Sequence, residues 1–400
     1  MASFQASLLL LFFLNIFHAP ASAFVLPVSK DPSTLQYLTS LSYGTPLVPT
    51  QLVLDLAAPS LWIDCSSRNV ASSSLRTILS RSIECLAAKS HRFDETSTRL
   101  PDQHQPCQIF PENTITGMIP REGNLVQDIV ALRSAETVYP LIFTCSSTQQ
   151  LNGLAVGAQG MVGLGRGRGS LSSQIFNSLN ARREFTLCLS SSSGVVLFGR
   201  NSYESQPEVE ILRSLAFTPV FTNQKGYFIT VNSIKIDGRR LSLSLPKNQE
   251  TKGRTQLSSI VPYTTMESSI YDTFKKAYLK AAAAMNMTRV TSVTPFELCF
   301  SSKGVDKVPM IDLVLQSEMV KWRIYGRNSM VRLGSEVMCL GFVDGGLNPE
   351  YPILIGGYQL EDVIMQFDLD TSILGFSSSL LLKHSSCSDF KSGFMSAESV

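Results

Sequence analysis

Short runs of β-branched, aromatic and other apolar residues, separated by turn residues, dominate the chain. Each run has the length of a strand, and the glycines, prolines and small polar residues between the runs are typical of turns. The clearest runs are residues 51–63, 124–132, 138–143, 195–198, 227–236, 311–315 and 364–376. This pattern predicts a mainly β protein.

Convincing helical patterns are few and short. Over residues 266–285, aromatic residues recur at helical spacing, and Ser268 or Ser269 stands where it can cap the helix. A shorter helix is expected over residues 172–179. The sequence therefore predicts strands with only a few short helices.

One arrangement of strand, turn and later glycine element occurs twice. In each copy an apolar strand runs into a tight turn, and an apolar segment ending in glycine follows about ninety to a hundred residues later. The turns lie at 55–62 and 257–263, and the glycine segments at 161–165 and 352–357. Such self-similarity indicates a duplicated architecture. We expect two β lobes facing one another, 24–205 and 206–400, joined near the polar stretch 201–213.

Residues 1–23 have the features of a secretory signal peptide. An apolar stretch is followed by Ala21-Ser22-Ala23, the A-x-A form that signal peptidase cleaves. A membrane anchor is the alternative, but crossing a bilayer takes about 20 apolar residues. We expect a mature chain that begins near Phe24, is secreted and is not held in a membrane.

All eight cysteines lie after this segment: Cys65, Cys85, Cys107, Cys145, Cys188, Cys299, Cys339 and Cys387. An even number in a secreted chain predicts four disulfides, although spacing alone leaves roughly a hundred connectivities open. No two cysteines form C-x-x-C, and the histidines do not complete zinc-ligand spacings, so we expect neither metal nor cofactor. Asn286-Met287-Thr288 is the only N-glycosylation sequon, and we expect a glycan on Asn286 if it is exposed.

Composition and charge narrow the kinds of partner. A chain of 400 residues with 44% hydrophobic residues can bury large cores. Its formal net charge is only +2, from 34 basic and 32 acidic residues, so no strong field draws it to nucleic acid or to an anionic membrane. Partners must be sought elsewhere.

The turn that begins at Asp55 carries a family resemblance. Asp55-Leu56-Ala57-Ala58-Pro59-Ser60-Leu61-Trp62 resembles the D-T-G-S-x-x-L-W stretch of pepsin-like (A1) aspartic proteases, with the same spacing from Asp to Trp. Further segments resemble a plant subfamily of that fold, which comprises the xylanase inhibitors, basic 7S globulins and extracellular dermal glycoproteins. These segments are 33–37, 45–49, 62–65, 160–166, 185–189, 322–326, 339–346 and 356–376.

The resemblance implies the bilobal pepsin-like fold and a disulfide pattern. The family pattern suggests four pairs: Cys188 with Cys387, Cys299 with Cys339, Cys65 with Cys145, and Cys85 with Cys107. The family usually carries more cysteines than this chain, so bridges in the N-terminal lobe are missing here.

The catalytic pair of such proteases is broken in this sequence. Aspartic proteolysis uses two carboxylates that share a proton, one acting as base on water while the other donates to the carbonyl. Asp55 keeps the first position, but Ser258 occupies the second, and a serine hydroxyl does not ionise there. We therefore expect no catalytic residues, only the vestigial positions Asp55 and Ser258. Taken without the resemblance, Asp55 would be read as a structural acid.

The residues around the pair have changed as well. Leu56 lacks the hydroxyl of the usual threonine, and Ala57 and Ile260 replace the two glycines. The flap is expected as a hairpin over residues 113–132 with its tip at residues 116–123, and no tyrosine occurs in this hairpin. Gly165-Arg166-Gly167-Arg168-Gly169 could suggest phosphate binding, but no βαβ unit supports it, and turn chemistry is the better account.

The resemblance implies a non-catalytic defence protein of the plant apoplast or cell wall. Its relatives bind and block microbial glycoside hydrolases, namely xylanases or xyloglucan endoglucanases. Such inhibition places loops of the C-terminal lobe in the hydrolase cleft, and the residues to consider are Lys303, Lys307 and Glu350. Relatives that block glucanases tend to have an arginine where this chain has Glu350, and an acid there would repel the carboxylates of the hydrolase.

Two other functions remain open at this point. One is an aspartic endopeptidase that uses Asp55 with an unconventional second group. The other is a non-catalytic seed or wall globulin that keeps the groove for binding peptides. The sequence does not indicate the oligomeric state.

Overall fold

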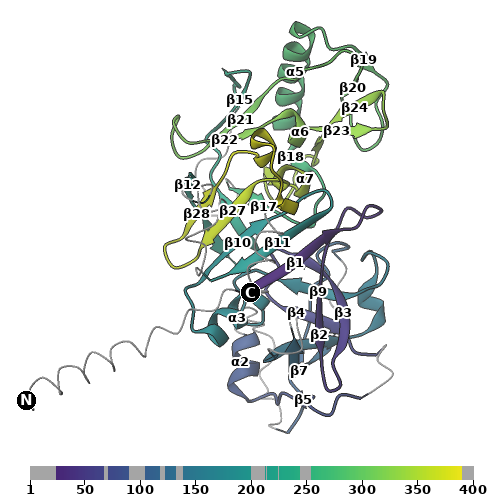
Figure 1. The fold of residues 1–400 in the computed structure, drawn as a ribbon, viewed down its shortest axis with the longest axis vertical. Coiled ribbons are helices and arrows are strands. Elements are labelled where there is room, and N and C mark those ends of the chain that lie inside the picture. Colours follow the sequence, from purple (N-terminus) through teal and green to yellow (C-terminus); the bar gives the residue numbers. More distant parts are fainter. Residues whose placement is uncertain are drawn as a thin grey trace, which may run out of the picture.

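The computed structural model describes residues 24–66, 71–89, 104–117, 122–131, 138–199, 212, 214–223, 225–243 and 254–389. Strands predominate, and they build a lower lobe from the first half of the chain and an upper lobe from the second half (Figure 1). The predicted signal peptide, residues 1–23, and the predicted lobe boundary at 205/206 both lie outside the described residues.

The first half of the chain contributes eleven strands within the described ranges. They are β1 (Phe24–Lys30), β2 (Tyr37–Tyr43), β3 (Val48–Asp55), β4 (Leu61–Asp64), β5 (Arg76–Thr77), β6 (Gln108–Ile109), β7 (Gly123–Ala131), β8 (Val138–Ser146), β9 (Ala158–Gly163), β10 (Glu184–Cys188) and β11 (Ser193–Phe198). The helices here are α2 (Ile83–Lys89), α3 (Leu171–Leu179) and the 3-10 turn η1 (Thr148–Leu151).

Within the described ranges, the second half contributes the following elements. Its strands are β12 (Ala216–Pro219), β13 (Phe221–Asn223), β14 (Gly226–Ile229), β15 (Ser233–Ile236), β16 (Arg239–Arg240), β17 (Thr255–Leu257), β18 (Thr264–Met266), β19 (Arg289–Val290), β20 (Cys299–Ser301), β21 (Ile311–Val314), β22 (Lys321–Ile324), β23 (Met330–Leu333), β24 (Val337–Leu340), β25 (Phe342–Asp344), β26 (Ile353–Ile355), β27 (Ile364–Asp368) and β28 (Ile373–Phe376). Its helices are α5 (Ser268–Ala284), α6 (Gly326–Ser329), α7 (Gly357–Leu360) and the 3-10 turn η2 (Leu380–Lys383).

Several predicted runs divide at turns in the structure. The run 51–63 becomes β3 and β4 on either side of the Asp55 turn, 227–236 becomes β14 and β15, and 364–376 becomes β27 and β28. Alternation of apolar and polar residues locates extended chain, but it does not show where a buried strand reverses.

The long helix predicted over residues 266–285 is present as α5, but it begins two residues later, at Ser268, and its cap differs. The side chain of Glu267 accepts hydrogen bonds from the backbone N–H groups of Ser269 and Ile270, so Glu267 is the N-cap of α5. The predicted caps, Ser268 and Ser269, are wrong because β18 ends at Met266 and places position 267 at the helix start. The hydroxyl of Ser268 instead donates to Asp344, over 2.7 Å.

A sheet that contains strands from both halves joins the lobes. Its strand order is β12-β28-β27-β10-β11-β1-β2-β3-β9-β4-β8-β7-β5. Within it, β10 pairs antiparallel with β27, and Phe185 stacks on Phe367 with ring centroids 4.7 Å apart. Tyr227 packs edge-on against Phe185. The hydrophobic core therefore continues from one lobe into the other.

The duplicated motif of the sequence is a duplicated crossing of strands. In the first lobe, β3 pairs parallel with β9, and β4 pairs antiparallel with the same β9. In the second lobe, β17 and β18 stand in the same relation to β26. A Cβ on Gly163 would lie 2.2 Å from the carbonyl oxygen of Ala58, and one on Gly356 would lie 2.4 Å from the carbonyl carbon of Tyr263. Glycine is required at both crossings because each backbone presses on a turn.

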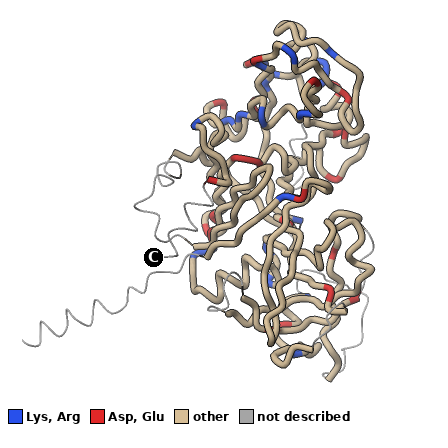
Figure 2. Tube along the Cα trace, turned by 45° about the vertical axis from the view of Figure 1, so that its right-hand side comes forward, with Lys and Arg blue, Asp and Glu red and all other residues tan. Residues whose placement is uncertain are grey.

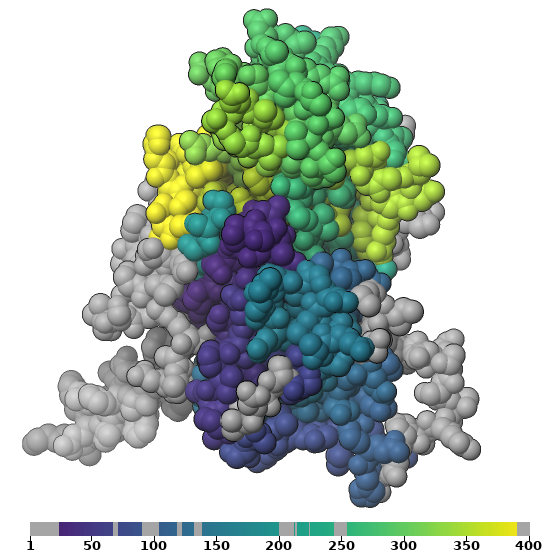
Figure 3. Space-filling model, turned by 90° about the vertical axis from the view of Figure 1, so that its right-hand side faces the viewer, coloured from purple at the N-terminus to yellow at the C-terminus, as the bar shows by residue number. Residues whose placement is uncertain are grey.

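Charge does not divide the molecule into a basic and an acidic half. Basic and acidic positions both occur in each lobe (Figure 2). In the space-filling view, residues of the first half fill the lower part of the molecule and residues of the second half the upper part (Figure 3). The formal charge of +2 is thus distributed over a mixed surface.

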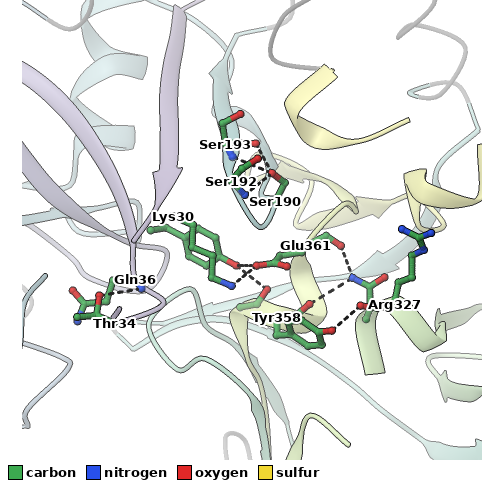
Figure 4. Close-up of polar contacts among 12 residues, drawn as sticks. Lys30, Thr34, Gln36, Ser190, Ser192, Ser193, Arg327, Tyr358 and Glu361 are labelled. Atoms are coloured by element: carbon green, nitrogen blue, oxygen red, sulfur yellow. Dashed lines mark hydrogen bonds and ion pairs between the residues drawn. The ribbon is translucent and has the colours of Figure 1, made fainter. Parts of the chain in front are cut away.

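A buried ion pair connects the two halves of the chain (Figure 4). Lys30 Nζ of β1 lies 2.5 Å from Glu361 Oε1, directly after α7, and both side chains are at least nine-tenths buried. The hydroxyl of Tyr37 donates to the same carboxylate over 2.9 Å. Asn328 Nδ2 donates to the backbone carbonyl of Glu361 over 2.6 Å. We call Lys30, Tyr37 and Glu361 the interlobe clasp.

Candidate functional site

The two duplicated turns meet where the lobes face each other. Ser259 Oγ accepts a hydrogen bond from the backbone N–H of Leu56 and donates to the carbonyl of Leu54, each over 2.9 Å. These bonds cross from the second lobe to both chain neighbours of Asp55. The reciprocal bonds would need a hydroxyl at position 56, but the Leu56 side chain is fully buried in the apolar core. Only one half of this brace is therefore present.

The carboxyl group of Asp55 is buried and is bonded at both oxygens. Its Oδ1 accepts from the backbone N–H of Ala57 over 2.8 Å, and its Oδ2 accepts from the hydroxyl of Thr114 over 2.6 Å. Asp55 is 1% exposed, whereas Thr114 is exposed. The carboxyl group thus lies directly beneath the surface, under the threonine.

The connection that carries Thr114 is anchored on both sides. Buried Asn113 donates from Nδ2 to the carbonyls of Gln150 and Asn152, 2.8 Å each. Trp62 Nε1 donates to the carbonyl of Glu112 over 3.1 Å. Because its two predecessors are fixed in this way, Thr114 is held over Asp55.

This connection belongs to a hairpin that begins earlier than predicted. Strand β6 pairs with the start of β7, with Ile109 opposite Gly123, so residues 110–122 join the two strands. The predicted tip at 116–123 lies partly outside the described residues, which stop at 117 and resume at 122.

Burial raises the pKa of Asp55 above the ordinary value of an aspartic acid. The hydrogen bonds from Thr114 and from the backbone of Ala57 and Ala58 act in the opposite direction, while the charge of Glu112 adds to the increase. Burial disfavours the charged carboxylate because it removes water from around it. The site therefore favours a protonated, neutral acid more than an exposed aspartate does.

Replacement of Asp55 with asparagine should improve stability more at pH 7 than at pH 3. The folded-state pKa is raised, so the destabilisation from ionising Asp55 is absent below the unfolded pKa of about 4, grows as the pH rises from there, and is constant above the folded pKa. Asparagine has the same shape and stays neutral throughout. Thermal unfolding of the wild type and Asp55→Asn at both pH values tests this. The prediction is contradicted if the melting temperature of Asp55→Asn, relative to that of the wild type, is lower at pH 7 than at pH 3.

The second turn presents a serine, with its hydroxyl engaged locally. Ser258 Oγ accepts from the backbone N–H groups of Ile260 and Val261, over 3.1 and 3.2 Å. Ser258 is 7% exposed. No hydrogen bond joins Asp55 to a second carboxylate among the residues that the structure describes. Asp55 can hold one proton. The corresponding group on the second turn is the hydroxyl of Ser258, which is hydrogen-bonded to the backbone of its own turn.

The methyl group of Ala57 is accommodated by a glycine of the other lobe. A Cβ built on Gly226 would lie 2.7 Å from the Cβ of Ala57, and Gly226 has a φ of +119°. Both the contact and the backbone conformation require glycine at 226. The extra carbon at position 57 thus occupies space that a side chain at 226 would otherwise fill.

The predicted target-binding residues lie on exposed parts of the C-terminal lobe and are not brought together. Lys303 and Lys307 follow β20, and Lys303 pairs with Glu336 on the turn between β23 and β24, over 2.7 Å. Glu350 precedes β26 and forms an ion pair with Lys225 from the β13–β14 hairpin. In the same loop as Glu350, Leu347 is 77% exposed.

The structure contains four disulfides, and their pairs are those that the family resemblance implies. They join Cys65 to Cys145, Cys85 to Cys107, Cys188 to Cys387, and Cys299 to Cys339. Asn286 is exposed just after α5, with a φ of 58°. Across the described ranges, no group of three or more histidine, cysteine, aspartate or glutamate side chains could hold a metal ion.

Family models match most of the chain. Residues 37–200 match the model described as xylanase inhibitor N-terminal, and residues 226–378 match xylanase inhibitor C-terminal. The chain belongs to the xylanase-inhibitor family. Its fold is the pepsin-like one that the sequence predicts, so both the family and the fold predictions are confirmed.

Named relatives of this family resemble the chain over nearly its whole length. A Nicotiana benthamiana protein named "Probable aspartic proteinase GIP2" is 40% identical, over 92% of this chain and 91% of its own. The crystal structure named "edgp" is 39% identical with a TM-score of 0.82, covering 92% of this chain and 97% of that one. The crystal structure of basic 7S globulin from soybean is 30% identical with a TM-score of 0.80, covering 92% and 99%.

Two further observations bear on where a member of this family works. The four disulfides are typical of a protein that folds in an oxidising compartment, which suggests an extracellular protein. None of the helices in the described part of the chain has the length and hydropathy that crossing a bilayer requires.

Sequence reasoning located Asp55 and Ser258 at the facing turns but missed Thr114. A tyrosine is the residue expected in this hairpin, whereas the residue that touches Asp55 is a threonine that follows a buried asparagine. The signal in the sequence is a short polar side chain in this connection.

Proposed function

We propose that this member of the xylanase-inhibitor family is a secreted, catalytically inactive protein that binds and inhibits microbial cell-wall glycoside hydrolases in the plant apoplast or cell wall. The single observation that carries the proposal is the pair of facing turns, where Asp55 is matched by Ser258 in place of a second acid. Cleavage of the signal peptide after residue 23 and glycosylation of exposed Asn286 belong to the same proposal.

The geometry supports inactivity for a chemical reason. Peptide hydrolysis by this fold needs a carboxylate to activate water and a carboxylic acid to protonate the carbonyl. Asp55 can fill one role at a time, and its two oxygens already accept from Ala57 and Thr114. The hydroxyl of Ser258 accepts from its own turn and supplies neither role.

The C-terminal loops support a binding role. Lys303, Lys307 and Leu347 are exposed on loops of the same lobe, with cationic and apolar side chains that suit the carboxylate-lined cleft of a hydrolase. The repulsion expected from Glu350 is reduced, because Lys225 pairs with it. In this proposal the vestigial positions Asp55 and Ser258 do not contact the target.

A binding panel tests the proposal. The purified protein is mixed with family 11 xylanases and family 12 xyloglucanases, and complex formation and residual hydrolase activity are measured. We expect a complex at micromolar concentration or below, and weaker inhibition by a Lys303→Ala/Lys307→Ala variant. The matched control is Lys276→Ala/Lys280→Ala, which removes two exposed lysines from α5 of the same lobe.

Two results would overturn the proposal. One is the absence of any complex across the panel. The other is peptide cleavage at acidic pH that disappears in Asp55→Asn, since that would make Asp55 a working catalytic acid and the protein an aspartic endopeptidase.

An apolar pocket supports a second candidate function, peptide binding without cleavage. Beside the hairpin connection lies a pocket of about 510 Å3 whose lining includes Leu61, Ile109, Phe110, Ile142 and Phe143. Such a pocket has the size and apolar character that accept side chains of a ligand. This observation supports the alternative of a 7S-globulin-like wall or seed protein, and pull-down of peptides from a wall extract would distinguish it from hydrolase inhibition.

A further inference from the structure

Three arginines line a cleft on the side of the Asp55 turn where α3 and β13 approach. The cleft has a volume of about 640 Å3. Arg166 and Arg168 come from the loop after β9, and Arg183 directly precedes β10. The rest of the lining is polar and includes Ser173 and Asn177 of α3 and Thr222 of β13. We call this the arginine cleft.

The sequence Gly165-Arg166-Gly167-Arg168-Gly169 builds one wall of the cleft. A Cβ on Gly165 would lie 2.3 Å from the carbonyl oxygen of Ala57, and one on Gly167 would lie 2.0 Å from that of Pro59. Because these glycines lack a Cβ, the loop can pack closely against the Asp55 turn, which supports the structural role predicted for them. Arg166 and Arg168 between them are exposed. The glycines therefore shape the loop, and the arginines face the cleft.

Two of the guanidinium groups have no carboxylate partner in the described part of the chain. Arg166 Nη1 donates to Thr222 Oγ1 over 2.8 Å, which holds the side chain across the cleft and leaves most of its five N–H donors unused. Arg183 contrasts with its neighbour Arg182, which pairs with Asp368 over 3.3 Å. The charges of Arg166 and Arg183 both act on the same buried side chain, Tyr227. They oppose the rise that burial causes in the pKa of Tyr227, Arg183 more strongly than Arg166.

The chemistry of the lining selects the class of ligand. A guanidinium fork matches a carboxylate in bidentate geometry, so the arginines favour an anion. The other side chains of the described lining carry hydroxyls and amides, which match sugar hydroxyls, and none of these described residues is aliphatic or aromatic. Its volume falls within the usual range for ligand sites, about 300–1,000 Å3.

We propose that the arginine cleft binds an acidic oligosaccharide, one that carries carboxylates on neighbouring sugar units. The proposal does not depend on inhibition of a hydrolase, because the cleft contains none of the residues Lys303, Lys307 and Glu350. Binding of such a segment within a longer uronate-containing polymer would attach the protein to that polymer and leave the C-terminal loops free.

Calorimetric titration of the mature protein at low ionic strength tests this. The probe is a trimer of galacturonic acid, and a galactose trimer of the same length is the neutral control. We expect the uronate trimer to bind at least ten-fold more tightly than the neutral one, and the binding to weaken as salt is added. Equal affinity for the two trimers would overturn the proposal.

Matched variants locate the binding. Arg166→Gln/Arg183→Gln should lose at least ten-fold in affinity for the uronate trimer, while Arg182→Gln, which removes the same charge one residue away, should bind like the wild type. Circular dichroism confirms that the double variant is folded. Unchanged affinity in a folded double variant would overturn the assignment. So would tighter binding of a hexaglutamate peptide than of the uronate, because the cleft would then recognise acidic peptides.

Hydrolase binding by the same variants separates this inference from the proposed function. We expect Arg166→Gln/Arg183→Gln to inhibit hydrolases as the wild type does. Loss of uronate binding with inhibition intact supports two separate sites, whereas loss of both activities in the folded variant would overturn their independence.

Discussion

Replacing Lys30 with methionine is expected to lower the free energy of unfolding by about 3–5 kcal/mol. The substitution removes the cation of the interlobe clasp but leaves the carboxylate of Glu361 buried between the halves of the chain. An unpaired buried charge costs far more than the pair itself contributes, because it has lost both water and its partner. Urea unfolding of the wild type and Lys30→Met at neutral pH measures the difference.

Two further variants show that the loss comes from the unpaired charge. Lys30→Met/Glu361→Gln removes both charges and should recover most of the lost stability. Lys235→Met breaks the ion pair with exposed Glu318 and should have a much smaller effect, since water solvates the carboxylate that remains. If the double variant is no more stable than Lys30→Met, the loss comes from packing of the lysine stem and not from charge.

Removing the Cys188–Cys387 disulfide, by alanine at both positions, is expected to cost about 5 kcal/mol of folding free energy. The bond joins residues 199 apart in the sequence, so its loss frees a very long loop in the unfolded chain. The Cys85–Cys107 bond, with a separation of 22, should cost about 3 kcal/mol by the same relation. Both sulfurs of the first bond also pack in a buried apolar cluster with Val25 and Ile364.

Equilibrium unfolding of the two double-alanine variants gives the comparison. The ranking, more than either value, carries the test, because the entropic relation depends on loop length and the two bonds differ about nine-fold in separation. A larger loss for the Cys85–Cys107 variant would show that local packing around α2 outweighs chain entropy.

The two-lobed fold was predictable from the sequence because each lobe repeats the same local pattern of apolar strand, turn and glycine segment. The apolar strand before Asp55 and the later glycine segment have counterparts around Ser258 and Gly356, and each pair forms a strand crossing in the structure. The same patterns placed Asp55 and Ser258 on corresponding turns. Strand reversals were harder to locate, since buried strands stay apolar on both sides of a turn.

The residues that sequence reasoning did not find depend on contacts between distant segments. Lys30 and Glu361 are separated by 331 positions, and nothing near either one indicates a buried pair. Thr114 meets Asp55 only because Asn113 and Trp62 fix the connection around it. The arginine cleft forms because a turn motif, the start of β10 and the β13 strand converge, which no local pattern of charge reveals.

The contact of Ala57 with Gly226 has a consequence for any attempt to rebuild a peptidase on this scaffold. Installing an acid at 258 by itself would leave a methyl at 57, where the D-T-G turn of pepsin-like proteases has only a hydrogen, and a leucine at 56, where a hydroxyl would complete the brace. Restoring glycine at 57 would in turn open a void beside Gly226. If peptidase activity is absent, as proposed, gaining it would therefore take concerted substitutions in both turns, at 56, 57 and 258.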